Sequence, residues 1–415
     1  MGKIVILTGN SLCHNPRVLK EATALAAAGF DVEILGAWLD AGYKVRDLAL
    51  LQNVQFCFTP VLDATVQKFV WWHSRLRVKA AHWWHQRAQR ETMWQMGYTV
   101  NALARVARQR KADLFIAHSE PALWALAQLQ NRKSEIGNRK FQIGVDMEDW
   151  FSEDLLPEAR KQRPIQLLKS LEQRVLSLAS HRTCTSQAMS AALAKEYGCL
   201  PPTVIYNSFP WADRQTLDGQ FKDRRDRTVP SLHWYSQTLG AGRGLEELFA
   251  ALPQVKHPLE IHLRGNFNAA TEVWLWPLVP ESWRKRVFLH PLVGNAELLS
   301  RIAEHDIGFA GELRYCKNKE FTVSNKILHY LLGGLAVVAS DTAGQREIAA
   351  QADGAVQIYP VGDTIAPAQR LNFLLENRVL LAAAKAAALQ VAEKTFCWER
   401  SASVLVQSVN TALTK

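Results

Sequence analysis

Several features that mark particular classes of protein are scarce in this chain. Its 415 residues include six cysteines, and no two of them have CxxC spacing. This pattern argues against a zinc site and a disulfide framework, and it favours a reducing compartment. No stretch reaches the roughly 18 apolar residues of a membrane-spanning helix. Met1–Lys3 leads into an apolar stretch without the pattern of a signal peptide, so we expect a cytoplasmic protein.

Acidic residues are fewer than basic ones. The chain has 49 Lys and Arg against 39 Asp and Glu, which gives a net charge of +10. This excess favours an acidic partner such as nucleic acid, anionic lipid or a phosphorylated ligand. Residues 68–111 hold much of the excess, with Glu91 as their only acidic side chain.

The same segment, 68–111, is rich in tryptophan. Its tryptophans are Trp71, Trp72, Trp83, Trp84 and Trp94. Tryptophan next to Lys and Arg is typical of a helix on an anionic membrane, at the inner face in a cytoplasmic protein. The alternative is a solvated basic helix whose tryptophans face the core. No named nucleic-acid motif accompanies the segment, so we expect no nucleic-acid partner.

The length favours two domains of about 200 residues each. We expect an N-terminal domain over residues 1–210, a polar linker over 211–230 and a C-terminal domain over 231–397. A final helix over about 398–415 is expected to complete the N-terminal domain. Short apolar stretches alternate with helical patterns in both halves, which predicts parallel, doubly wound α/β sheets. After Ser340 we expect few further elements.

The segment from Thr322 to Glu347 predicts an anion-binding helix start. Ser324 is a good N-cap, so the backbone N–H groups of Asn325 and Lys326 would face an anion, and Lys326 adds a positive charge. Gly333-Gly334 would end the helix, and Ala336–Ser340 would follow as a buried strand. An ordinary helix-loop-strand unit is the alternative.

Ligands of open α/β sheets bind at the carboxyl ends of the strands. With two such sheets joined by a linker, we expect a crevice between the domains. The polar residues at the predicted strand ends are His118, Glu120, Asp146–Asp149, Arg243, Glu312 and the helix start at Ser324.

Six motifs occur in an order that resembles family 4 of the retaining glycosyltransferases. In the N-terminal half they are HNPRVLKEATALAAAGFDVEILG (14–36), DLFIAHSEPALWAL (113–126) and VIYNSFP (204–210). In the C-terminal half they are GAGRGLEEL (240–248), LVGNAELLSRIAEHDIGFA (292–310) and SNKILHYLLGGLAVVASDTAGQREI (324–348). The resemblance implies the GT-B fold, in which two Rossmann-like, doubly wound domains face each other across a cleft.

The resemblance also implies an activity. The C-terminal domain would bind a nucleotide-diphospho-sugar, and the N-terminal domain would meet the acceptor, an envelope glycan or a lipid-linked molecule. Arg243 falls where the family places a basic residue against the diphosphate, and Ser324, Asn325 and Lys326 fall on a second diphosphate contact. Such cations stabilise a departing diphosphate without a metal. We therefore expect a metal-independent hexosyl or related transferase with retention, and no cofactor beyond the nucleotide sugar.

Two departures from the family pattern affect the site. Many relatives have a pair of glutamates here, the second of which holds the ribose hydroxyls, and this chain has His329 at that second position. Glu312 and Glu320 have the spacing of such a pair, although Glu320 is expected before the helix start. His329 can still hydrogen-bond to a hydroxyl, or it packs between helix and sheet.

The second departure concerns the strand end at residues 145–150. Glu148 lies where many relatives have a histidine facing the donor sugar. It could stabilise positive charge on the sugar, bind a hydroxyl or act as a base toward the acceptor. The candidate catalytic residues are Glu148, Asp149 and His118. Gly9 and Asn10 in the loop after the first strand, together with Glu347, complete the candidate substrate-binding residues.

Other functions are less consistent with these motifs. The glycines of GAGRG have the wrong spacing for a dinucleotide fingerprint, which argues against a dehydrogenase. The histidine at position 329 supports a non-catalytic GT-B protein that binds nucleotide sugar or a partner transferase. An epimerase or phosphorylase of related fold is a third alternative.

Overall fold

The computed structural model describes residues 2–131, 141–224 and 227–414. The described residues do not include positions 1, 132–140, 225–226 and 415. These positions fall within the predicted ranges 1–210, 211–230 and 398–415. The chain forms two compact units. The first comprises Met1–Thr185, Met189–Ile205 and Ala402–Lys415, and the second comprises Ser186–Ala188 and Tyr206–Ser401.

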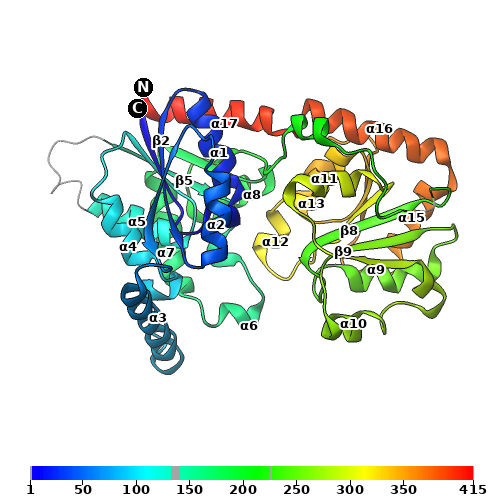
Figure 1. The fold of residues 1–415 in the computed structure, drawn as a ribbon, viewed down its shortest axis with the longest axis horizontal. Coiled ribbons are helices and arrows are strands. Elements are labelled where there is room, and N and C mark those ends of the chain that lie inside the picture. Colours follow the sequence, from blue (N-terminus) through cyan, green and yellow to red (C-terminus); the bar gives the residue numbers. More distant parts are fainter. Residues whose placement is uncertain (1, 132–140, 225–226, 415) are drawn as a thin grey trace. The chain divides into compact units, whose positions relative to one another are not determined.

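The first unit contains a seven-stranded sheet with the order β3-β2-β1-β4-β5-β6-β7, and all neighbouring strands are parallel (Figure 1). Its strands are β1 Lys3–Leu7, β2 Asp31–Trp38, β3 Cys57–Asp63, β4 Leu114–Ala117, β5 Gln142–Met147, β6 His181–Cys184 and β7 Thr203–Val204. The main helices are α1 Pro16–Ala27, α2 Ala41–Leu50, α3 Lys68–Ala88, α4 Val100–Ala107, α5 Glu120–Asn131, α7 Ile165–Leu178 and α8 Gln187–Tyr197, with the short α6 Pro157–Arg160.

The second unit contains a six-stranded parallel sheet with the order β10-β9-β8-β11-β12-β13. Its strands are β8 Ser231–Thr238, β9 Glu260–Asn266, β10 Val287–His290, β11 Ile307–Ala310, β12 Ala336–Ser340 and β13 Val356–Tyr359. Its helices are α9 Leu245–Ala251, α10 Ala269–Leu275, α11 Asn295–Ala303, α12 Lys317–Phe321, α13 Asn325–Gly333, α14 Ala343–Ala349, α15 Ala366–Glu376 and α16 Arg378–Lys394. The last helix, α17 Trp398–Leu413, begins in this unit and continues into the first.

Both sheets reverse their strand order beside their first strand. In the first unit this point lies between β1 and β4, and in the second it lies between β8 and β11. Helices cover both faces of each sheet (Figure 1), so the prediction of doubly wound α/β sheets is confirmed. Sheets of this kind bind ligands beyond the carboxyl ends of the strands at the reversal point.

Local sequence explains the elements that lead to these ends. Asn15 caps α1 by accepting from the Val18 N–H at 3.1 Å, and Pro16 is the first helical residue. In the second unit, α13 ends at Gly334, whose φ of 78° suits glycine. Gly308 of β11 lets this helix approach the sheet, because a Cβ there would lie 2.2 Å from the Tyr330 ring.

Two expectations about the elements were wrong. The chain after Ser340 is not poor in elements, since it forms α14, β13, α15, α16 and α17. Strands β3 and β13 were missed because Thr59 and Pro60 in β3 and Gln357 in β13 interrupt the continuous apolar pattern of buried parallel strands. The edge position of β3 tolerates Pro60. Among the described residues, no helix combines the length and the apolar character needed to cross a membrane.

A stack of buried histidines crosses the second sheet. His262 Nδ1 lies 3.0 Å from His290 Nε2, and the His305 ring lies 4.7 Å from the rings of both His262 and His233. Burial, together with the neighbouring His290, Arg224 and Arg264, lowers the pKa of His262 to about 3. Burial also holds the pKa values of His233 and His305 well below the ordinary value. The charged side chains next to these rings are Arg224, Arg264, Asp223 and Glu260.

We predict that this stack makes the second unit sensitive to acid. The unfolded chain protonates His262 near pH 6.5, whereas the folded chain does so near pH 3, so the stabilisation is complete above pH 6.5 and is lost as the pH falls. Between pH 7 and pH 5, the free energy of unfolding measured with urea should therefore fall by roughly 2 kcal/mol less in His262→Asn than in the wild type. The exposed His73→Asn serves as the control. Equal losses in both variants and the wild type would contradict the prediction.

Candidate functional site

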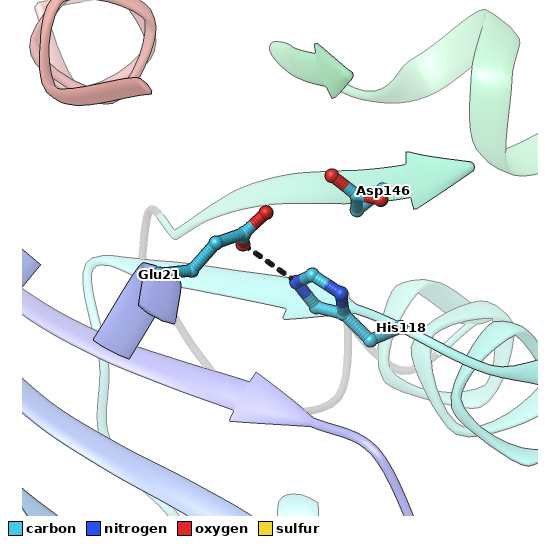
Figure 2. A group of neighbouring side chains, drawn as sticks. All are labelled: Glu21, His118 and Asp146. Atoms are coloured by element: carbon cyan, nitrogen blue, oxygen red, sulfur yellow. Dashed lines mark ion pairs between the residues drawn. The ribbon is translucent and has the colours of Figure 1, made fainter. Parts of the chain in front are cut away.

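Buried charged side chains gather at the carboxyl edge of the first sheet. Glu21 of α1, His118 after β4 and Asp146 of β5 point toward one another (Figure 2), and all three are fully buried. His118 Nε2 lies 2.9 Å from Glu21 Oε2. The candidate catalytic residue His118 is thus part of a buried charge cluster.

Arg17 of α1 completes this cluster. Its guanidinium donates to both carboxylate oxygens of Asp146, at 3.0 and 2.7 Å, and to the carbonyl oxygen of Ile205 at 2.8 Å. The Thr183 hydroxyl donates to Asp146 at 2.5 Å. Burial alone would raise the pKa of Asp146, but Arg17 and the hydrogen bonds outweigh it and hold this pKa well below its usual value. Asp146 is therefore ionised.

Glu21 holds a proton on His118. Burial on its own would lower the pKa of the imidazole, but the Glu21 carboxylate outweighs burial and raises it to about 9. Burial raises the pKa of Glu21, and His118 and Arg17 oppose that rise. At neutral pH the pair of His118 and Glu21 therefore keeps a proton, beside the ion pair of Arg17 and Asp146.

The same three residues offer the donor set of a metal site, with ligand atoms within 4.8 Å of one another. However, Arg17 occupies both oxygens of Asp146 and lies 3.5 Å from Glu21, so a positive charge already stands where an ion would. The cluster therefore fits a divalent metal poorly. In the part of the chain that the structure describes, no other group of His, Cys, Asp and Glu has suitable geometry.

Glu148 and Asp149 follow β5 and are half-buried. Asn15 Nδ2, at the start of α1, donates to Glu148 Oε1 at 3.1 Å. Burial raises the pKa of Glu148 to about 8, since the nearby Asp146 and Asp149 add to the effect and His118 only partly opposes it. Glu148 is therefore mostly protonated at neutral pH and can donate a hydrogen bond.

The backbone of the loop after β1 binds a carboxylate side chain of the same unit. Gly9 has a φ of 67°, and the exposed Asn10 follows it. Beyond them, the backbone N–H groups of Leu12 and Cys13 donate to the buried carboxylate of Asp47 at 2.8 and 2.7 Å. These N–H groups are engaged by a side chain of the same unit.

In the second unit, the start of α13 contains a preformed cation. Ser324 is the N-cap, but its hydroxyl does not bond to the helix; it donates to Glu312 Oε1 at 2.9 Å. Lys326 Nζ donates to the same oxygen at 2.9 Å. Burial would raise the pKa of Glu312, but Lys326 and Lys319 outweigh it and bring this pKa to about 2. Asn325 accepts from Asn207 Nδ2 at 3.1 Å.

Arg243 lies in the loop after β8, at the same edge of the sheet. Its side chain is exposed, and Nη1 donates to the Ser236 hydroxyl at 2.7 Å. The structure thus brings Glu312, Ser324 and Lys326 into one hydrogen-bonded group, and Arg243 belongs to a separate loop.

His329 is buried on α13 rather than exposed at its surface. Its ring stacks on Phe209 with centroids 3.9 Å apart, and Nδ1 lies 3.0 Å from the Tyr235 hydroxyl. Glutamate in this position would bring a charge among aromatic rings. The substitution by histidine therefore suits a packed environment.

Three other predicted glutamates have structural partners. Glu320 lies before the start of α13, as expected, and belongs to the separate short helix α12, where it accepts from the Ala343 N–H at 3.1 Å. Glu347 accepts from the N–H groups of Gln187 and Ala188 at 3.0 and 2.9 Å. Glu120, at the start of α5, pairs with Arg163.

The sequence reasoning missed Arg17 and Glu21. Both lie on the same arc of α1 as the buried residues Val18, Ala22 and Leu25. Two opposite charges one helical turn apart on an otherwise apolar face are a usable signal, because such groups are rarely buried unless they are paired.

Comparison with known proteins gives a fold. No protein-family model matches the chain, and no curated protein matches its sequence. Among solved structures, sucrose-phosphate synthase from Thermosynechococcus elongatus has a TM-score of 0.66 at 14% identity, over 100% of both chains. A glycosyltransferase from Rickettsia africae has a TM-score of 0.68 at 12% identity, over 100% of this chain and 99% of that one.

A third similar structure is HepE from Anabaena in complex with UDP and glucose, with a TM-score of 0.65 at 16% identity over 100% of both chains. These similar structures are GT-B glycosyltransferases. Together with the two parallel sheets and their flanking helices, they show that the chain has the α/β architecture of the GT-B fold.

We predict that Arg17→Met destabilises the first unit strongly. The variant leaves Asp146 buried without its partner, which costs about 3–5 kcal/mol of unfolding free energy. Urea unfolding should show this loss, and Arg17→Met with Asp146→Asn should recover part of it. Arg110→Met, which breaks a more exposed pair with Glu33, should cost less than about 1 kcal/mol. Similar losses for both arginine variants would show that burial of the pair is unimportant.

Proposed function

We propose that this protein is a glycosyltransferase that moves a sugar from a nucleotide-diphospho-sugar to an acceptor. The observation that carries the proposal is the group of Ser324, Lys326 and Glu312 at the start of α13, which holds a cation at the carboxyl edge of a doubly wound sheet. The similar structure of HepE, solved with UDP and glucose, supports a donor of this class.

The donor would bind to the second unit through its diphosphate. Glu312 uses one hydrogen of the Lys326 ammonium and leaves the others for phosphate oxygens. The backbone N–H groups at the start of α13 add the positive end of the helix dipole. Arg243, exposed at the same sheet edge, would supply a second cation.

These cations make a metal unnecessary in the proposed reaction. Negative charge builds on the nucleoside diphosphate as it leaves, and fixed cations stabilise that charge. We propose that transfer is metal-independent, uses no cofactor beyond the nucleotide sugar and retains the anomeric configuration, as the resemblance to family 4 implies.

Glu148 of the first unit would act in its uncharged form. Because its pKa is about 8, it carries a proton at neutral pH and can donate a hydrogen bond to a sugar hydroxyl. The acceptor, an envelope glycan or a lipid-linked molecule, would meet the first unit in the cytoplasm.

We predict that Lys326→Ala weakens donor binding by about 10- to 100-fold, because a charge-assisted contact to phosphate is lost. Thermal shift with UDP, GDP, ADP, dTDP and their sugars would identify the base, and titration with the best nucleotide would give the affinity. Lys326→Ala alone leaves the Glu312 carboxylate unpaired. The double variant Lys326→Ala with Glu312→Gln removes that carboxylate and should bind the nucleotide as poorly as the single variant.

The matched control is Lys385→Ala, which breaks an ion pair with Asp306 before β11, at the opposite end of that strand from Glu312. This control should bind the nucleotide as the wild type does. The donor site is in the wrong place if Lys385→Ala and Lys326→Ala lose affinity equally, or if no nucleotide stabilises the wild type.

We also predict that Glu148→Gln keeps most of the transfer activity at pH 7, whereas Glu148→Ala loses about 100-fold, the usual scale for one preorganised contact. Wild-type kcat/KM should fall as the pH rises through about 8, as Glu148 loses its proton, and Glu148→Gln should not show this fall. An equal loss of transfer activity in Glu148→Gln and Glu148→Ala would indicate that Glu148 acts as a base, and it would overturn the uncharged role proposed for this side chain.

A non-catalytic GT-B protein is the second candidate, because His329 is packed between Phe209 and Tyr235 where many family 4 proteins have a ribose-binding glutamate. Product analysis separates the candidates. Nucleotide binding without turnover of any donor supports the non-catalytic protein, and a changed sugar without an acceptor indicates an epimerase.

A further inference from the structure

The outer face of α3 carries large apolar side chains in solvent. The exposed fractions are 83% for Phe69, 59% for Trp72, 59% for Leu76 and 52% for Trp83. With 3.6 residues per helical turn, these four side chains lie within about 60° of one another around the helix axis. We refer to Phe69, Trp72, Leu76 and Trp83 as the outer stripe.

The opposite face fixes the orientation of α3. Val78, Ala81 and His85 are buried, and His85 Nε2 lies 3.1 Å from the carbonyl oxygen of Lys161. Trp71 is half-buried, and its ring packs edge-on against Tyr98 with centroids 4.7 Å apart. Figure 1 shows α3 (dark blue) projecting from the body of the first unit. The outer stripe is therefore held toward solvent.

The charge on α3 is of one sign. The helix contains Lys68, Arg75, Arg77, Lys79 and Arg87 and no acidic residue. Lys79 and Arg87 are exposed and flank the outer stripe, and the Arg87 guanidinium lies 4.9 Å from the centre of the Trp83 ring. The nearest acidic residues in sequence have other partners: Asp63 pairs with Lys44, and Glu91 accepts from the N–H groups of Gln166 and Leu167. They therefore do not neutralise this face.

We propose that the outer stripe of α3 binds the surface of a membrane that contains anionic phospholipid. The helix would lie in the plane of the interface, with Phe69 and Leu76 in the acyl boundary and Trp72 and Trp83 at the level of the headgroups. Lys79 and Arg87 would meet the lipid phosphates.

Two other occupants fit this face less well. A second copy of the chain would bring two helices without any acidic residue against each other, and their charges would repel. Single-stranded nucleic acid would use stacked aromatic rings, but the outer stripe includes the aliphatic Leu76 between Trp72 and Trp83. An anionic bilayer satisfies both the apolar and the basic side chains.

The proposal is independent of glycosyl transfer, because it concerns binding to vesicles that contain neither donor nor acceptor. A protein that fails the donor-binding test can still bind vesicles, and the reverse also holds.

The test is co-sedimentation of the full chain with vesicles of phosphatidylcholine and with vesicles in which phosphatidylglycerol replaces part of it. We expect binding only to the anionic vesicles, and release by salt. Lys79→Ser with Arg87→Ser should weaken binding about 30-fold, at about fivefold for each basic residue near the surface. Trp72→Ser with Leu76→Ser and Trp83→Ser should weaken it about 100-fold through lost apolar burial.

The matched controls lie in the second unit. Val273→Ser with Val379→Ser removes two side chains that are each 75% exposed, and Arg284→Ser with Lys285→Ser removes two exposed charges. Both should bind as the wild type does. Binding that is absent, equal on neutral vesicles or unchanged in the α3 variants overturns the proposal. It is also overturned if the wild type ignores vesicles but forms a dimer, or binds an oligonucleotide, through the outer stripe.

Discussion

The structure of the first unit depends on the ion pair between Arg17 and Asp146, which has no access to water. A carboxylate in this position is tolerable only with a partner of excellent geometry, and Arg17 provides one by binding both oxygens. The same guanidinium also binds the carbonyl oxygen of Ile205, so a single side chain of α1 ties β5 to the chain after β7. Glu21 lies one turn further along α1 and pairs with His118. The position of α1 against the ends of β4 and β5 follows from these pairings.

Two carboxyl groups, Glu148 and Glu312, have opposite protonation states because their neighbours differ. Glu148 lies two residues beyond Asp146, and its partial burial together with the nearby Asp146 and Asp149 raises its pKa to about 8. Glu312 is just as dependent on its neighbours, but Lys326 and Ser324 supply compensation that Glu148 does not have, and its pKa falls to about 2. Groups whose environments separate their pKa values in this way are common where one acts as a neutral donor and another as a fixed charge. Each unit of this protein carries one of the two.

The sequence predicted those parts of the fold that depend on local pattern. β12 has the predicted bounds, Ala336–Ser340, since its apolar residues are continuous, and α13 starts after Ser324 and ends at Gly334 because both residues act locally. The site was predictable only in part. Lys326 follows from the helix start, but the role of Arg17 depends on Asp146, which is 129 residues away in sequence. Likewise, the burial of His329 depends on a ring, Phe209, that no local pattern connects to it.

The pairing of Lys326 with Glu312 has a consequence for the way a nucleotide would arrive. The two side chains are only 13% and 15% exposed, and their charges cancel at close range. This pair projects little electric field into solvent, although the whole chain has a net charge of +10. Long-range steering accelerates encounter only where charge is uncompensated. Of the two cations proposed for the donor, the exposed Arg243 would then carry the long-range attraction and its dependence on ionic strength, and Lys326 would act on contact and affect the residence time of the nucleotide.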